Sequence, residues 1–249
     1  MVLGLLTAAI VLALGGPSVD LPPPDADWDY QLGGNRAVPD RVTVVDRDRK
    51  AEPLAGAYSI CYVNGFQTQP DERRFWRDRW ALVLKDHGKP VVDEAWGEWL
   101  LDIRTDRKRE RLAEIVGRWT DHCADDGFDA VEYDNLDSFA RSHGLVSRAD
   151  ARAFARLIVA RAHAAGLAAG QKNWVELGEA GPRIGFDFAI AEECGRWREC
   201  QGYVDTFGEH VLVVEYRQAD FAWTCDHFGS LSVVRRDVDL SVDGIRRWC

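Results

Sequence analysis

Short apolar runs alternate with amphipathic segments along most of the chain. Eight of the runs predict β-strands. Several are almost continuously apolar, as expected for parallel strands that are buried on both faces. The predicted strands lie near Trp28–Leu32, Val42–Val45, Tyr58–Val63, Pro90–Asp93, Phe128–Tyr133, Leu167–Lys172, Phe186–Ala191 and Val211–Tyr216.

The segments between these runs repeat their apolar residues at helical spacing. This pattern predicts helices over Arg73–Lys85, Arg107–Asp121 and Arg148–Ala165, the last with Ser147 as N-cap and Gly166 as its stop. Alternating strands and helices indicate a parallel α/β fold. Eight strands in 249 residues favour a single-domain (β/α)8 TIM-like barrel. The chain has no GxGxxG after its first strand and no GxxxxGK[ST], so a nucleotide-binding sheet lacks its usual support.

The N-terminus has the pattern of an export signal. Residues 2–14 are largely apolar and uncharged, a length that suits a signal peptide better than a membrane span. We expect a signal peptide in residues 1–16, a proline-rich linker in 17–27 and the barrel in 28–249. The protein is then secreted, without stable membrane insertion. An uncleaved anchor is the alternative.

The six cysteines fit an exported protein, because disulfides persist in oxidising compartments. Fifteen pairings are possible. Cys194 and Cys200 bracket a short loop, and we favour pairing them. Cys249 ends the chain, where Cys225 is a suitable partner. This leaves Cys61–Cys123. Zinc binding is disfavoured because the chain has neither CxxC nor HxxxH spacing.

The net charge of −10 argues against nucleic acid as a partner, because phosphate binding requires clustered Lys and Arg. It is compatible with a neutral or cationic substrate. Ten tryptophans are many for this length, and exposed ones form platforms for flat ligand faces. We expect a monomer.

The run that begins at Phe128 ends in a cluster of carboxylates: Glu132, Asp134 and Asp137. Acidic groups crowded at the end of a buried strand resist joint ionisation, which is one way to obtain an acid and a base at neutral pH. The alternative is an acidic turn that caps the next helix.

Other predicted strands also end in polar or aromatic residues, which a barrel would gather at its active-site face. A ring of carboxylates with interleaved aromatics is typical of a sugar site, where glycoside cleavage needs two carboxyl groups. The residues that we expect to bind substrate are Tyr62, Asp93, Trp96, Glu132, Asn135, Lys172, Asn173, Glu215 and Tyr216.

An ordered set of short motifs resembles glycoside hydrolase family 114, the endo-α-1,4-polygalactosaminidase family. The motifs are Trp28-Asp-Tyr-Gln31, Cys61-Tyr62, Glu98-Trp99-Leu-Leu-Asp102, Phe128-Asp-Ala-Val-Glu-Tyr-Asp134-Asn135, Lys172-Asn173, Glu192-Glu-Cys194, Cys200 and Glu215-Tyr216. The resemblance implies a (β/α)8 barrel that hydrolyses polymers of α-1,4-linked galactosamine without a cofactor or metal. It places the catalytic carboxylates on Asp134 and Glu192. We assign Asp134 as nucleophile or stabiliser and Glu192 as acid/base, or the reverse. Glu193 replaces Glu192 if the register differs by one residue.

Three alternatives compete with this assignment. Lys172 at a barrel strand end could form a Schiff base, as in an aldolase-type lyase. A barrel that binds polysaccharide without cleaving it would keep the aromatics and lose the acid pair. A divalent cation among Glu132, Asp134 and Asp137 is disfavoured, because their spacing does not match an EF-hand loop.

Overall fold

A computed structural model of the protein describes residues 19–249. The expected signal peptide and the first two residues of the expected linker therefore lie outside the described residues. The rest of the linker segment lies against the base of the sheet. Tyr58 donates a 2.7 Å hydrogen bond to the carbonyl of Asp20, and the Ala26 amide donates to Ser232 Oγ at 2.9 Å.

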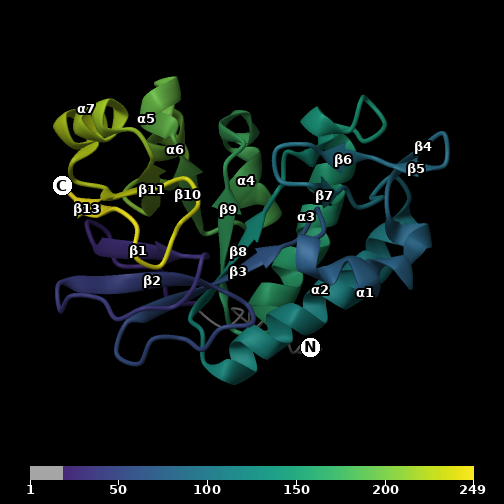
Figure 1. The fold of residues 1–249 in the computed structure, drawn as a ribbon, viewed down its shortest axis with the longest axis horizontal. Coiled ribbons are helices and arrows are strands. Elements are labelled where there is room, and N and C mark those ends of the chain that lie inside the picture. Colours follow the sequence, from purple (N-terminus) through teal and green to yellow (C-terminus); the bar gives the residue numbers. More distant parts are fainter. Residues whose placement is uncertain (1–18) are drawn as a thin grey trace, which may run out of the picture.

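Eight parallel strands form a nearly closed barrel, which confirms the predicted fold (Figure 1). The β1 strand packs against β12, and an antiparallel strand, β13 (Arg246–Trp248), extends the sheet beyond β12. The parallel strands are β1 (Asp27–Gln31), β2 (Val42–Asp48), β3 (Tyr58–Asn64), β8 (Ala130–Asp134), β9 (Ala168–Lys172), β10 (Phe188–Glu192), β11 (Val211–Glu215) and β12 (Ser232–Arg236).

The prediction of a barrel strand at Pro90–Asp93 is wrong. This segment belongs to two small hairpins outside the barrel, and its Val91 exchanges backbone hydrogen bonds with Leu84 and Leu100. The hairpins are β4 (Lys85–Asp86) with β5 (Lys89–Pro90), and β6 (Val92–Asp93) with β7 (Glu98–Trp99). The eighth barrel strand is β12, which was not predicted. Only three apolar or small residues precede Arg235, and this run is too short to indicate a strand. Asp134 and Glu192 therefore end the fourth and sixth barrel strands.

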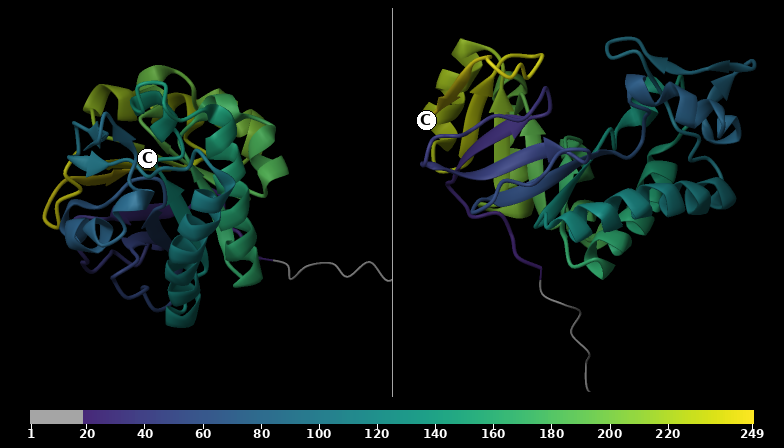
Figure 2. Two further views of the ribbon diagram at one scale, coloured as in Figure 1. Left: turned by 90° about the vertical axis from the view of Figure 1, so that its right-hand side faces the viewer. Right: turned by 60° about the horizontal axis from the view of Figure 1, so that its bottom comes forward.

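Helical elements follow the barrel strands from β3 to β11, whereas residues 32–41 and 49–57 join the first three strands without a helix and β12 leads directly into β13. The two long predicted helices are confirmed as α2 (Asp106–Asp126) and α3 (Arg148–Ala164), which lie side by side (Figure 2). The Ser147 hydroxyl caps α3 by accepting from the Asp150 amide at 3.1 Å. The predicted helix Arg73–Lys85 is instead α1 (Arg73–Arg77) and the short turn η2 (Trp80–Leu82).

The remaining helical elements are short and lie close to the strand ends. They are η1 (Pro70–Glu72), η3 (Ser138–Arg141), η4 (Val175–Leu177), α4 (Ala180–Ile184), α5 (Cys194–Trp197), α6 (Cys200–Phe207) and α7 (Gln218–Phe228). Among the described residues, no helix has both the length and the apolar composition needed to cross a bilayer.

Successive strand residues point alternately into the barrel and toward the helices, so the fold has two hydrophobic cores. This explains why the strands read as continuous apolar runs. The barrel interior contains Trp28, Val44, Ile60, Ala130, Ala168, Phe188, Ile190, Leu212, Val214 and Val234. The core under the helices contains Val63, Val131, Tyr133, Ala169, Ala189, Ala191, Val211, Val213 and Val233.

Three disulfides join the segments that the cysteine spacing suggested. Cys61–Cys123 connects β3 to α2, Cys194–Cys200 connects α5 to α6, and Cys225–Cys249 ties α7 to the C-terminal residue. The expected pairing is confirmed.

A buried ion pair fastens the two ends of the barrel to each other. The fully buried Asp29 of β1 lies 3.0 Å from Arg236 Nη1 on β12 and 2.6 Å from Arg246 Nη1 on β13. Trp248 Nε1 adds a 2.8 Å hydrogen bond to the carbonyl of Trp28. These contacts connect the two ends of the sheet through side chains.

We expect Asp29→Ala to lower the free energy of unfolding by about 3–5 kcal/mol, because it leaves the buried Arg236 charge without a counter-ion. Urea denaturation measures the change. Asp243→Ala is the control, since its exposed carboxylate lies 3.8 Å from Arg36 and should contribute nothing measurable. Equal effects of the two substitutions would contradict the role of Asp29.

Candidate active site

A cavity of about 460 Å³ opens at the carboxyl ends of the barrel strands. Active sites of (β/α)8 enzymes occupy this face because the strand-to-helix loops meet there. Nine of the predicted site residues line the cavity. They are Tyr62, Asp93, Trp96, Asp134, Asn135, Lys172, Asn173, Glu192 and Tyr216.

Strand periodicity brings the polar groups to this point. Along β8, the inward positions run from Ala130 through Glu132 to Asp134, and along β10 they end at Glu192. The residue that follows each strand end is left-handed: Asn135 has φ 64°, and Glu193 has φ 58°. The chain therefore turns sharply directly after Asp134 and after Glu192, whose carboxylates point into the barrel mouth.

Lys172 is the centre of the charge arrangement. Its buried Nζ lies 3.0 Å from Glu132 Oε1, 3.6 Å from Asp134 Oδ2 and 3.7 Å from Glu192 Oε2. It also donates to the Tyr30 hydroxyl at 2.8 Å. Burial alone would lower the pKa of Lys172, but the carboxylates Asp134, Glu132 and Glu192 outweigh burial and raise it well above its ordinary value. Lys172 is therefore a fixed cation.

Asp134 and Glu192 each accept hydrogen bonds that fix their direction. Asp134 accepts from the Tyr62 hydroxyl at 2.8 Å and from the Asn135 amide at 2.6 Å. Glu192 accepts from the Tyr216 hydroxyl and from Asn173 Nδ2, the latter at 3.5 Å. Because oxygens of both carboxylates lie close to one Lys172 Nζ, the two groups can reach the same bond of a substrate.

A second carboxyl pair lies beneath the cavity. Asp46 and Glu132 are fully buried, and both oxygens of Asp46 and Oε2 of Glu132 lack donors if both groups are ionised. Burial and the neighbouring Glu132 raise the pKa of Asp46 well above its ordinary value. A proton on one of these carboxyl groups can be donated to the other, which would serve two of the three oxygens and leave a single negative charge on the pair.

One wall of the cavity consists of a polar network around Arg141. Its guanidinium lies 2.8 Å from Asp93 Oδ2 and donates to Asn135 Oδ1 at 3.0 Å. Next to it, Glu98 accepts from Asn64 Nδ2 at 2.9 Å. Burial raises the pKa of Glu98 to about 7. Asp93 and Glu98 come from the hairpin β6–β7, so the segment that was wrongly assigned to the barrel still supplies the site.

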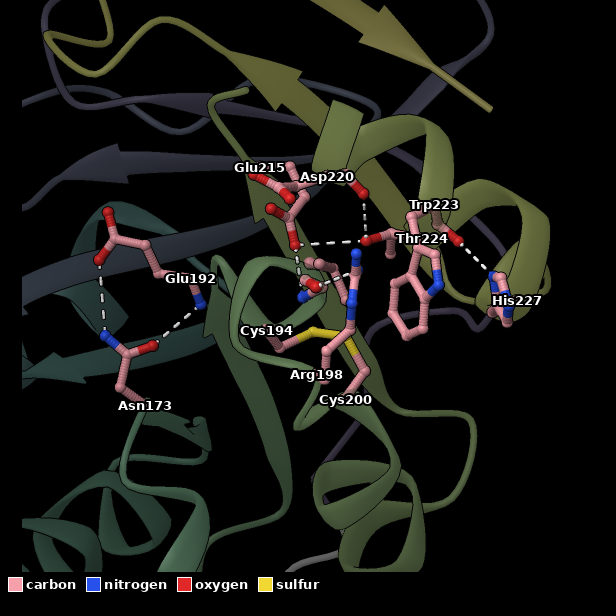
Figure 3. Close-up of a disulfide and its surroundings, with 12 residues drawn as sticks. Asn173, Glu192, Cys194, Arg198, Cys200, Glu215, Asp220, Trp223, Thr224 and His227 are labelled. Atoms are coloured by element: carbon pink, nitrogen blue, oxygen red, sulfur yellow. Dashed lines mark hydrogen bonds between the residues drawn. A yellow bond between two sulfur atoms is a disulfide. The ribbon is translucent and has the colours of Figure 1, made fainter. Parts of the chain in front are cut away.

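Two predicted substrate-binding residues do not reach the cavity. Glu132 lies beneath it, where its carboxylate holds Lys172 and Tyr30. Glu215 points outward from β11, because Val214 and Tyr216 occupy the inward positions. Its buried carboxylate accepts from the Gly195 amide at 2.6 Å and from Thr224 Oγ1 at 3.3 Å, next to the disulfide Cys194–Cys200 (Figure 3).

The other acidic candidates also separate in space. Glu193 turns away from the cavity and pairs with Arg196 at 2.8 Å, so Glu192 is the residue that faces the site. Asp137 pairs with Arg141 at 2.9 Å and makes no side-chain cap of η3, although a capping role was expected. The ammonium of Lys172 occupies the space between Glu132 and Asp134, where a divalent cation was considered as an alternative.

Among the polar residues of the site that sequence reasoning missed are Tyr30, Asp46, Glu98 and Arg141. Tyr30 and Asp46 lie on strands that were correctly predicted, and inward periodicity from Trp28 and Val44 would have identified them. Glu98 lies on the two-residue strand β7 and Arg141 ends the short turn η3, and elements this short have no periodic signal.

A barrel mouth with two carboxylates held within reach of one bond defines a glycoside hydrolase type of site. The model of glycoside-hydrolase family GH114 matches residues 13–249, and the chain belongs to this family of glycoside hydrolases. A comparison with curated protein sequences finds no match.

Two solved structures share the fold. The crystal structure of Aspergillus fumigatus Ega3 in complex with galactosamine has a TM-score of 0.76 and 20% sequence identity, covering 93% of this chain and 98% of that one. The glycoside hydrolase domain of PelA from Pseudomonas aeruginosa has a TM-score of 0.61 and 12% identity, covering 91% of this chain and all of that domain. At these identities, the similarity establishes the fold.

Burial raises the pKa of Glu215 to about 7, so the folded state retains its proton where the unfolded chain has released it. The resulting stability is complete below the unfolded pKa of about 4.3 and is lost as the pH rises through 7. Between pH values of about 4.3 and 7, we expect the free energy of unfolding of the wild type to fall relative to that of Glu215→Gln. Urea denaturation at several pH values measures this difference. Parallel stability curves would contradict this prediction.

Proposed function

We propose that the protein is an exported hydrolase of polysaccharides that contain α-1,4-linked galactosamine. The observation that supports this most directly is the pair Asp134 and Glu192, both within 3.7 Å of Lys172 at the mouth of a GH114 barrel. The galactosamine complex of the similar Ega3 structure supports the choice of sugar.

Each carboxylate has surroundings that suit a role in glycoside cleavage. Asp134 lines only the central cavity and accepts from Tyr62, which suits a nucleophile or charge stabiliser next to the sugar carbon. Glu192 is the more exposed of the two side chains. In the proposed reaction, Glu192 gives its proton to the glycosidic oxygen as the bond to the sugar carbon breaks, and Asp134 stabilises the positive charge on that carbon. Water then supplies the hydroxyl of the new sugar end and returns a proton to Glu192.

The charges that line the cavity suit a cationic sugar. Six carboxylates line it, whereas Lys172 and Arg141 are the two cations, and both are already paired. An ammonium group on the substrate would find acceptors at Asp93 and Glu98. The exposed Trp96 at the rim offers a flat face to a sugar ring. The carboxylates are Asp93, Glu98, Asp134, Asp137, Glu192 and Asp239.

The Schiff-base alternative requires a neutral Lys172 with a free electron pair. Three carboxylates near its Nζ raise its pKa and keep it protonated, so it cannot attack a carbonyl group. The geometry therefore favours hydrolysis.

Export as a monomer completes the proposal. Three disulfides, with all six cysteines paired in the described chain, suit an oxidising compartment. Cleavage of the N-terminal segment near residue 16 is part of this proposal.

We expect Asp134→Asn and Glu192→Gln each to lower kcat/KM on an α-1,4-galactosamine polymer by about 10³-fold or more, because general acid–base and nucleophilic groups contribute on this scale. Mass spectrometry of the released oligosaccharides measures the activity. Glu193→Gln is the matched control, since this neighbouring carboxylate pairs with Arg196 outside the cavity. Retained activity in either variant would refute that residue's role.

If Glu98 binds the substrate ammonium, KM should rise as the pH falls through about 7, because Glu98 then loses its charge. Glu98→Gln should have a high KM with a flatter pH profile. The amines of the polymer titrate equally for both enzymes, so the difference isolates Glu98. An unchanged KM profile in Glu98→Gln would exclude this contact.

A further inference from the structure

A second cavity of about 270 Å³ adjoins the central one. Asp137, Asn173 and Glu192 line both cavities, so the two meet at the proposed acid/base residue. Asp134 lines only the central cavity. A substrate that occupied both cavities would therefore pass Glu192 where they meet. Only the part of the substrate in the central cavity would lie next to Asp134.

An aromatic surface forms much of the second cavity. Trp197 on α5 is 62% exposed, the highest value among the exposed large hydrophobic residues of residues 19–249. The rings of Trp174 and Phe139 lie on the same lining, 4.7 Å apart between centroids and tilted by 57°. Trp174 is 5% exposed and its Nε1 donor has no partner. A buried donor without an acceptor is costly in a folded protein.

The charged groups of this lining are Glu176, Glu199 and Arg148, together with the shared Asp137 and Glu192. Two effects raise the pKa of Glu199: its burial, which is the larger, and the negative charge of the neighbouring Glu176. The Arg148 guanidinium lies over the Phe139 ring, 5.2 Å from its centroid. An ammonium group near the two glutamates would relieve their repulsion.

We propose that this second cavity binds the amino sugar on the leaving-group side of the cleaved bond, with its ring on Trp197 and its ammonium near Glu176 and Glu199. The inference rests on the proposed function. It explains why Glu192 lies where the cavities meet, since an acid that protonates the bridging oxygen must lie between the sugars that this oxygen joins.

Trp197 can be tested directly, because a side chain that is 62% exposed contributes little buried area to folding. The parent for binding is Asp134→Asn, which removes turnover. We expect Trp197→Ala in this parent to raise the Kd for long α-1,4-galactosamine oligomers by about tenfold, because aromatic contact area is lost. Trp80→Ala is the matched control, since Trp80 is exposed and lines neither cavity. Isothermal titration calorimetry measures Kd, and an unchanged Kd in Trp197→Ala would overturn the proposal.

The charge preference has its own test in the same parent. Glu176→Gln together with Glu199→Gln should weaken binding of free-amine oligomers and leave fully N-acetylated oligomers unaffected. Glu114→Gln with Glu209→Gln is the control, because both are exposed carboxylates outside the two cavities. Equal affinity of both double variants for free-amine oligomers would refute the ammonium contact.

Turnover by the otherwise wild-type enzyme separates this inference from the proposed function. With Trp197→Ala, we expect kcat/KM to fall for long oligomers and the product lengths to shift. An active wild type whose product pattern survives Trp197→Ala would refute the second cavity alone. If wild type releases no products while Trp197→Ala still weakens oligomer binding, the hydrolase proposal fails and the sugar-binding cavity stands.

Discussion

The buried ammonium of Lys172 is the interaction on which the site depends. Without it, Glu132, Asp134 and Glu192 would repel one another in a poorly solvated barrel mouth. Burial and the neighbouring Glu132 raise the pKa of Asp46, which favours its neutral form and lowers the negative charge beneath Lys172. The protein can therefore hold two carboxylates close to the same bond without another cation.

The barrel supplies the rigidity that this balance needs. Asp134, Lys172 and Glu192 each end a strand whose earlier inward residues are packed in the barrel interior, so the two carboxylates cannot move apart to relieve repulsion. The ion pair of Asp29 with Arg236 and Arg246 holds the first and last strands together. The disulfide Cys194–Cys200 and the hydrogen bond from the Gly195 amide to the outward-pointing Glu215 fix the loop after Glu192 (Figure 3).

Strand periodicity accounts for both the success and the errors of the sequence prediction. It separates Glu192 from Glu193, and the same rule applied to Glu215 and Tyr216 would have turned Glu215 away from the cavity. The false strand at Pro90–Asp93 and the missed strand Ser232–Arg236 have short apolar runs, which hairpins and barrel strands share. Glu98 lay within a recognised motif but had no assigned role, because its position depends on how a loop folds over the barrel.

The sequence by itself determined the class of fold, the disulfide pairing that its spacing favoured and nine of the residues that line the cavity. These follow from local rules: apolar periodicity, cysteine spacing and polar residues at strand ends. The tertiary structure decided which carboxylates face one another, that Lys172 lies between them and that a second cavity begins at Glu192. Those relations join residues that are far apart in the chain, and they arise only when the closed barrel brings its strand ends to one face.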